Sequence, residues 1–306
     1  MKKILILLLV TFSTTVYAKE IISIQTPYGP SHAGNAAMMK IIDEANKVQN
    51  KYTFILENRP GGNQSIALNH INKSPNTQLA IIAASFVENF QTGQVKRELY
   101  NPIWSLGDAC WAVYSLNGKQ GSVDSLRGST NEITAGSVAI GNATHLTSLV
   151  IGERLSIPIR FVVFKSSNES LVNMVGNNGV TFTTDRAENF ETFKPKNDKL
   201  VILAMTCPQR HPAYPEIRTL KEQGYDTPFV FNTLVAHRDM NKTKQDEIAN
   251  IFTSATNTVG KQWILQNSGF VPPQFSNVTA KQHLDNSINL MIKLRAKYAK
   301  DIATDK

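Results

Sequence analysis

Short apolar runs alternate with amphipathic stretches through the first third of the chain, after its opening residues. The runs at 21–25, 52–56 and 78–84 are typical of strands, whereas 35–49 and 64–73 carry apolar residues at helical spacing. The run at 78–84 is continuously apolar, as strands of a buried parallel sheet are. Because strands and helices alternate, the pattern predicts an α/β layer with a parallel sheet.

The middle of the chain repeats this alternation, and the end is helical. The repeat predicts a second α/β layer in series with the first. Strand patterns occur at 133–137, 161–164, 180–184 and 201–206, and helix patterns at 143–153, 170–175, 242–255 and 279–300.

The sequence contains no Gly/Ser linker between the two layers, so ordered strands are expected to join them. The segments 110–116 and 229–236 are the candidates for these crossing strands. A hinge of two strands allows rotation without slack. The predicted division is domain I at 19–113 and 231–306, and domain II at 114–230.

The first eighteen residues have the composition of a signal peptide. Lys2 and Lys3 precede an unbroken apolar run at 4–10, and Ala18 stands at the usual cleavage spacing. The run is too short to span a bilayer, which disfavours the alternative of an uncleaved anchor. The sequence therefore predicts a cleavable signal peptide at 1–18 and an exported protein.

The formal net charge is +8, with 32 basic and 24 acidic residues. The basic residues are scattered, and no block of them interleaves with aromatic residues, so the sequence argues against nucleic-acid binding. The resulting mild positive field favours anionic solutes. The alternative is that the excess of basic residues serves only solubility.

The chain has two cysteines, Cys110 and Cys207. In an exported protein an even number of cysteines indicates a disulfide, here a single one. Spacing alone leaves open the alternative of two unrelated buried thiols.

The segment Glu57–Gly62, read as ENRPGG, follows a predicted strand and precedes a predicted helix. A strand, a glycine turn and a helix start place free backbone N–H groups at a sheet edge, where an anion can bind. In an exported chain this arrangement suggests capture of a small acid.

The candidate ligand residues are neutral donors and ring walls in loops that follow predicted strands, where open α/β sheets bind ligands. Each also has a local alternative, such as satisfying turn backbone or packing. Asp185 would repel an anion, so a ligand amine or a backbone group is its expected partner. The candidates are Tyr28, Ser31, His32, Ser85, Ser137, Asn142, Thr144, Phe164, Thr184 and Asp185.

Four segments in order carry a resemblance to a known family: ENRPGG at 57–62, a Ser/Gly-rich loop ending in His-Leu at 137–146, 201–206 with Arg210 shortly after, and 215–225. Together they resemble the periplasmic solute receptors of tripartite tricarboxylate transporters, the Bug family, over nearly the whole chain after the signal peptide. The resemblance implies a two-lobed periplasmic binding-protein fold of type II-like topology, each lobe a sheet flanked by helices.

The resemblance implies a receptor, and the expected protein is a non-catalytic monomer with no cofactor and no metal. Its ligand would be a small organic acid or an amino-acid-like solute, delivered to membrane permease subunits. The first loop departs from the family pattern: 28–35 lacks paired glycines, and Asn35 replaces an expected Asp. The stretches 76–78 and 162–166 also differ, and these changes affect ligand identity more than fold.

Two other functions stay open. A secreted hydrolase would need an activated nucleophile, but no Gly-x-Ser-x-Gly elbow occurs, and Ser137 and His145 lack an obvious orienting acid. A sensory or adaptor protein could use the same fold and the same closing motion with a different output.

Overall fold

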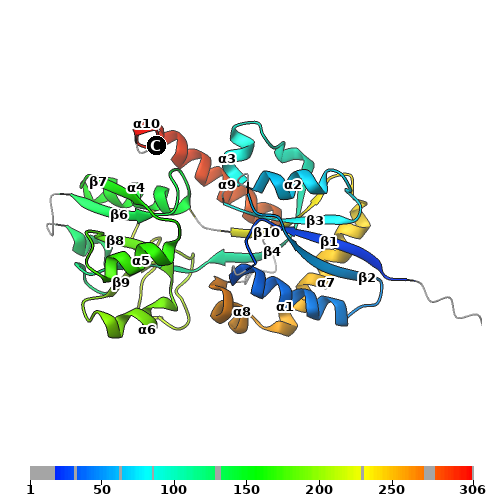
Figure 1. Ribbon diagram of the computed structural model, residues 1–306, viewed down its shortest axis with the longest axis horizontal. Coiled ribbons are helices and arrows are strands. Elements are labelled where there is room, and N and C mark those ends of the chain that lie inside the picture. The colour runs from blue at the N-terminus through cyan, green and yellow to red at the C-terminus, as the bar shows by residue number, and fades with distance from the viewer. Residues whose placement is uncertain are drawn as a thin grey trace, which may run out of the picture.

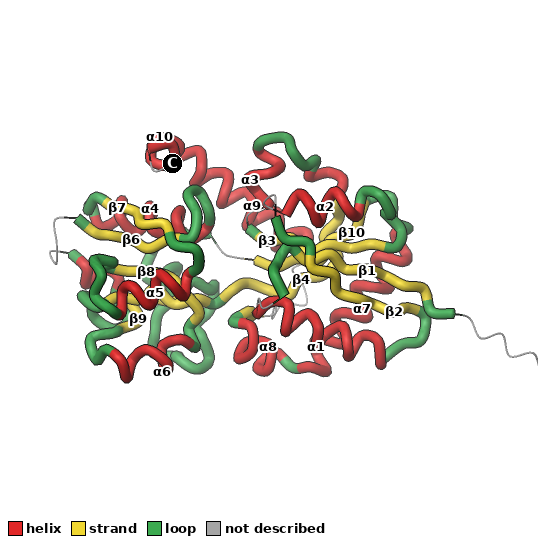
Figure 2. The backbone as a smooth tube through the Cα atoms, viewed as in Figure 1, coloured by secondary structure: helices red, strands yellow, loops and turns green. Residues whose placement is uncertain are grey.

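The computed structural model describes residues 18–30, 33–61, 64–84, 86–127, 132–228, 231–271 and 280–304. Two sheets lie side by side, each with its own helices (Figure 1). We call the six-stranded sheet and the helices packed on it lobe I, and the five-stranded sheet and its helices lobe II. In the tube view, helices and loops surround the strands of each lobe (Figure 2). The predicted fold class, two α/β lobes, is confirmed.

Lobe I has the strand order β11-β4-β10-β3-β1-β2. Strands β1, β2 and β3 are parallel, and β10 runs antiparallel to both of its neighbours. The strands are β1 Glu20–Thr26, β2 Tyr52–Asn58, β3 Gln78–Ala83, β4 Tyr100–Ala109, β10 Phe231–His237 and β11 Phe270–Val271. The helices are α1 Ala33–Lys47, α2 Ser65–Ile71, α3 Phe86–Gln91, α7 Lys242–Val259 and α8 Lys261–Ser268.

Lobe II has the order β7-β6-β8-β5-β9, in which β6, β7 and β8 are parallel and β5 is antiparallel to β8 and β9. The strands are β5 Trp111–Ser115, β6 Ile133–Ser137, β7 Ile159–Val163, β8 Phe182–Arg186 and β9 Val201–Met205. The helices are α4 Ala143–Leu155, α5 Ser167–Val175 and α6 Asn189–Phe193. The C-terminal helices, α9 Ala280–Lys297 and α10 Ala299–Thr304, follow the lobe I strands in the chain.

The predicted strands and helices of both layers are confirmed, with boundaries shifted by a few residues. The sheets expected to be parallel are mixed, because β10 and β11 in lobe I and β5 in lobe II run antiparallel to their neighbours. The single helix expected at 279–300 is instead α9 followed by α10.

The first crossing between lobes is a single residue long. Strand β4 ends at Ala109 in lobe I, and β5 begins at Trp111 in lobe II, so the chain crosses at Cys110. The second crossing enters β10 through 229–230, which lie outside the described residues. The predicted domain boundary at residue 113 falls inside β5, and the division into 19–113 with 231–306 and 114–230 stays a prediction.

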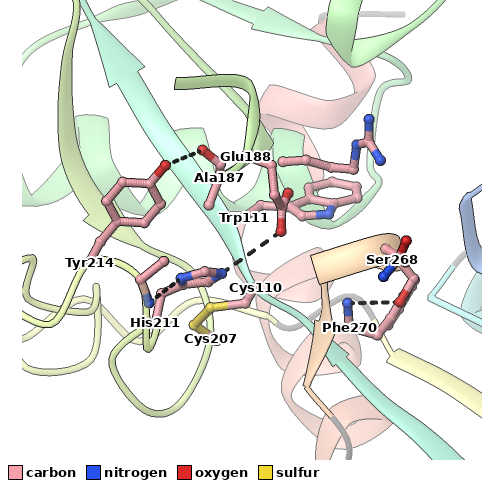
Figure 3. Close-up of polar contacts among 12 residues, drawn as sticks. Cys110, Trp111, Ala187, Glu188, Cys207, His211, Tyr214, Ser268 and Phe270 are labelled. Carbon is pink, nitrogen blue, oxygen red and sulfur yellow. Dashed lines mark hydrogen bonds and ion pairs between the residues drawn. A yellow bond between two sulfur atoms is a disulfide. The ribbon is translucent and has the colours of Figure 1, made fainter. Parts of the chain in front are cut away.

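The predicted disulfide is confirmed. Cys110 and Cys207 are bridged, both are buried, and their Cα atoms lie 4.5 Å apart. The bridge ties the first crossing to the segment that follows β9, beside His211, whose Nε2 lies 3.8 Å from Glu188 Oε1 (Figure 3). The covalent link therefore sits where the two lobes join.

The signal peptide predicted at 1–18 falls almost wholly on residues 1–17, which lie outside the described residues. Within the described part of the chain, no helix is both long and apolar enough to cross a membrane.

Candidate functional site

The carboxyl ends of the parallel strands in both lobes border the same crossing. In lobe I, the end of β4 lies at the same edge as the end of β3, because both pair with the start of β10. Asp108 of β4 pairs with Phe231, and the last residue of β3 pairs with Asn232. In lobe II, β5 enters beside the end of β8, because Trp111 pairs with Arg186. The sheet edges at which open α/β folds bind ligands are thus brought together by the hinge.

Tyr28 lies at the lobe I edge. Its hydroxyl donates to Asn232 Oδ1, and the Asn58 side chain donates to the Tyr28 carbonyl at 2.9 Å. Burial raises the pKa of Tyr28 well above its usual range. The phenol therefore stays neutral at physiological pH, and the loop after β1 is tied to β2 and β10.

The ENRPGG segment braces this loop. The Arg59 Nε donates to Gln25 Oε1 at 2.6 Å, Nη2 donates to Glu57 at 2.8 Å, and the Arg59 backbone N–H donates to the Thr26 carbonyl at 2.8 Å. Burial opposes ionisation of Glu57, but hydrogen bonds from Arg59, Ser23 and Gln25 hold its pKa below the usual value. Helix α2 has only seven residues, and 62–63 lie outside the described residues, so anion capture by this turn stays a prediction.

Three predicted donors of lobe II form one hydrogen-bonded loop at the start of α4. Asn142 caps the helix, since its Oδ1 accepts from the His145 backbone N–H and from Thr144 Oγ1, both at 2.9 Å. The Ser137 hydroxyl donates to the Ala139 carbonyl at 3.2 Å and lies 3.2 Å from Thr144 Oγ1. The local role is thus visible for all three, and their contact with a ligand stays a prediction.

His145 belongs to the core of lobe II. It is fully buried, its Nδ1 accepts from the Gly141 backbone N–H at 3.1 Å, and its ring lies 4.2 Å from the Phe161 ring. Neither contact involves Ser137, so the arrangement gives no support to a serine–histidine pair.

Phe164, Thr184 and Asp185 lie at the same edge of lobe II. The Phe164 backbone N–H donates to the Ser137 carbonyl at 2.8 Å, and Thr184 is buried near the end of β8. Asp185 is also buried, and its carboxylate accepts from Ser167 Oγ at 2.7 Å, from the backbone N–H of Arg186 and from Asn189. Burial raises the pKa of Asp185 despite these hydrogen bonds.

The structure thus groups six candidates at the lobe II edge and Tyr28 at the lobe I edge, while three candidates lie outside the described residues. Asn232 was missed, because its neighbour Tyr28 is 204 residues away in the chain and no sequence pattern links them. The three undescribed candidates are Ser31, His32 and Ser85.

A pocket of about 620 Å³ lies elsewhere, between α4, the start of β7 and the C-terminal helices. Its lining includes Leu149, Ile157, Ile159 and Tyr298. Because it adjoins the amino end of β7, it is not at the edge described above. In the described ranges, no three His, Cys, Asp or Glu side chains gather in a way that could hold a metal ion.

Replacing Tyr28 by phenylalanine is expected to cost about 1 to 2 kcal/mol of unfolding free energy, because the buried Asn232 amide loses its hydroxyl partner. Because the pKa of Tyr28 is raised in the folded state, the stability that the neutral hydroxyl contributes is present below about pH 10 and is lost as the pH rises further. The difference in unfolding free energy between wild type and Tyr28→Phe is therefore expected to be smaller at high pH. Denaturant unfolding at pH 7 and pH 11 measures both effects.

The matched control is Tyr100→Phe, since that hydroxyl also donates to an asparagine, Asn72, at 2.8 Å. Both variants are expected to lose stability, and only Tyr28→Phe is expected to weaken ligand binding. Wild-type stability in Tyr28→Phe would contradict the prediction.

No protein-family model matches the sequence, and no curated protein matches it. Among solved structures, a TctC solute-binding protein from Polaromonas, without ligand, is similar with a TM-score of 0.73 at 17% identity, over 92% of this chain and 98% of that chain. MatC from Rhodopseudomonas palustris with bound malate gives 0.66 at 14% identity, over 90% and 98%. A further R. palustris protein, solved with adipate, gives 0.67 at 17% identity, over 92% and 97%.

At these identities the likeness concerns the fold, and it agrees with the fold that the resemblance implies. The chain has the two-lobed fold of periplasmic solute-binding proteins.

Proposed function

We propose that this chain is a non-catalytic periplasmic receptor that captures one small carboxylate between its lobes and presents it to a membrane transporter. The observation that carries the proposal is the meeting of two parallel-strand edges at one disulfide-linked crossing. Rotation about such a crossing opens and closes the two edges around a solute. The signal peptide predicted at 1–18 is part of this proposal, because it directs the chain to the periplasm.

The chemistry of the described candidates suits an anion held by neutral donors. Taking a carboxylate out of water is costly unless several donors replace the lost hydration. Hydroxyl and amide groups and the start of α4, a helix of thirteen residues, supply such donors around Asn142. Similar structures that hold malate and adipate support a ligand of this class.

The hydrolase alternative is less well supported, because the hydrogen bonds described above for Ser137 and His145 serve the loop and do not join the two side chains. Turnover of esters or amides by the purified protein, abolished in Ser137→Ala, would overturn the receptor proposal. Deletion of the gene separates the transport role from a sensory or adaptor role with the same ligand. Loss of ligand uptake into cells on deletion supports the transport role, and normal uptake supports the sensory or adaptor role.

A panel of carboxylates tests the ligand class. Malate, adipate, citrate and glutamate at millimolar concentration are expected to raise the Tm, because a ligand that binds only the folded state stabilises it by about 2.7 kcal/mol at 100 times its Kd. Differential scanning fluorimetry measures the shift, and the matching methyl esters, which lack the charge, are the control.

Ser137→Ala and Thr144→Ala are expected to reduce the rise in Tm that the ligand causes. They are expected to change the Tm of the ligand-free protein by less than they reduce this rise. A panel that leaves the Tm unchanged would refute the acid-binding proposal.

A further inference from the structure

The C-terminal helix pair α9–α10 spans both lobes (Figures 1 and 2). At its lobe I end, the Arg97 side chain donates to Asp285 Oδ1 at 2.7 Å. At its lobe II end, Lys297 pairs with Glu153, and the Tyr298 hydroxyl donates to Glu153 Oε2 at 2.6 Å. The helix pair is therefore a third connection between the lobes, in addition to the two crossings of the chain.

Apolar packing follows the same path. One face of the helix pair belongs to a single buried cluster that also contains Phe86 and Val235 of lobe I and Leu146 and Leu149 of lobe II. A change in the angle between the lobes must therefore move this helix against at least one of them. The helix residues in the cluster are Leu284, Ile288, Met291, Leu294, Tyr298 and Ile302.

Arg295 contacts the residue that directly precedes the candidate Asn142. Its Nη1 donates to the Gly141 carbonyl at 2.5 Å, and its Nη2 lies 3.9 Å from Glu88 Oε1 on α3 of lobe I. The side chain is only 17% exposed, so little solvent competes for these contacts. Gly141 directly precedes Asn142, the residue that caps α4.

The Gly141 backbone is held from two sides. Its N–H donates to His145, and its carbonyl accepts from Arg295. Its φ of +77° favours glycine, and a Cβ placed there would lie 2.7 Å from Arg295 Nη1, so a larger residue would also displace the guanidinium. Because the Gly141 carbonyl and the Asn142 N–H belong to one planar peptide group, fixing the carbonyl also fixes the direction in which the chain enters Asn142.

We propose that Arg295 is a positioning residue for the lobe II loop at 137–145, and that through it the C-terminal helix couples lobe I to the ligand site. The planar guanidinium suits this task, since it presents several donors in a fixed geometry to a carbonyl on one lobe and a carboxylate on the other. The effect on ligand affinity rests on the proposed function, whereas the effect on the loop does not.

The first experiment measures amide hydrogen exchange of Gly141, His145 and Leu146 in the ligand-free protein. Arg295→Ala is expected to raise exchange at these amides about tenfold, the size expected for losing one hydrogen bond from a charged group. Arg295→Lys, which keeps the charge, is expected to restore part of the protection.

Two control variants separate Arg295 from its surroundings. Lys293→Ala removes a positive charge from an exposed position of the same helix and is expected to leave exchange unchanged. Arg97→Ala removes the lobe I anchor of the helix without touching lobe II. Arg97→Ala is expected to raise exchange less than Arg295→Ala does, because the helix keeps its apolar contacts with lobe I. Wild-type exchange in Arg295→Ala, or an equal rise in Lys293→Ala, would overturn the role of Arg295.

The second experiment uses malate or adipate, whichever raises the Tm more, as the probe in isothermal titration calorimetry. Arg295→Ala is expected to raise the Kd about tenfold, and Lys293→Ala to leave it unchanged. If no acid of the panel binds wild type, the proposed function fails, and the exchange experiment still decides the role of Arg295. If binding is normal in Arg295→Ala, the coupling to the ligand site is refuted.

Discussion

The variant Cys110→Ala/Cys207→Ala is expected to lose about 4 to 5 kcal/mol of unfolding free energy, which corresponds to a fall in Tm on the order of 10 °C. The bridge joins residues 97 apart, and closing so long a loop removes much conformational freedom from the unfolded chain. Both sulfur atoms are buried at the junction of the lobes, so the bridge also limits how far β5 and the segment after β9 can separate there. Thermal and denaturant unfolding of the two proteins measure the loss.

A reductant provides the control. Tris(2-carboxyethyl)phosphine is expected to lower the Tm of wild type toward that of the alanine variant and to leave the variant itself unchanged. Mass measurement after alkylation, with and without reduction, reports whether both thiols were bridged. Equal stability of the wild type and the variant would show that the bridge contributes nothing to folding.

Gly136→Ala is expected to lose roughly 3 kcal/mol, because the β6 position before Ser137 has no room for a methyl group. A Cβ there would lie 1.8 Å from Ser170 Oγ on α5 and 3.2 Å from Thr183 Oγ1 on β8. The two hydroxyls are themselves 2.7 Å apart and buried, so α5 would have to move away from the sheet. That shift would also displace the candidate donors that follow β6, and we expect weaker ligand binding together with lower stability.

The second-site variant Gly136→Ala/Ser170→Ala is expected to recover part of the loss, because it removes the closest clashing atom. Gly29→Ala is the control, since a Cβ at Gly29 meets no atom within 4 Å. Denaturant unfolding of the set measures the differences. If Gly136→Ala is as stable as Gly29→Ala, then α5 does not hold β6 in the way described.

The candidate site was predictable in outline but not in its contacts. Ser137, Asn142 and Thr144 could be placed at a strand end and a helix start, because both features are local in sequence. That the Asn142 oxygen serves the helix cap follows from the same local pattern. The pairing of Tyr28 with Asn232 could not be predicted, since the partners are 204 residues apart and meet only because β10 returns to lobe I beside β3.

The same distinction applies to the whole chain. Apolar periodicity determined the type and order of most strands and helices, because the period of a strand or helix is set by its own backbone geometry. It did not predict β4, β11, α3, α6 and α8. Tertiary structure alone decided that β5, β10 and β11 run antiparallel to their neighbours and that α9 spans both lobes. It also decided that Arg295 meets a carbonyl 154 residues away. These features depend on the path by which the chain crosses between the lobes, and local periodicity contains no record of that path.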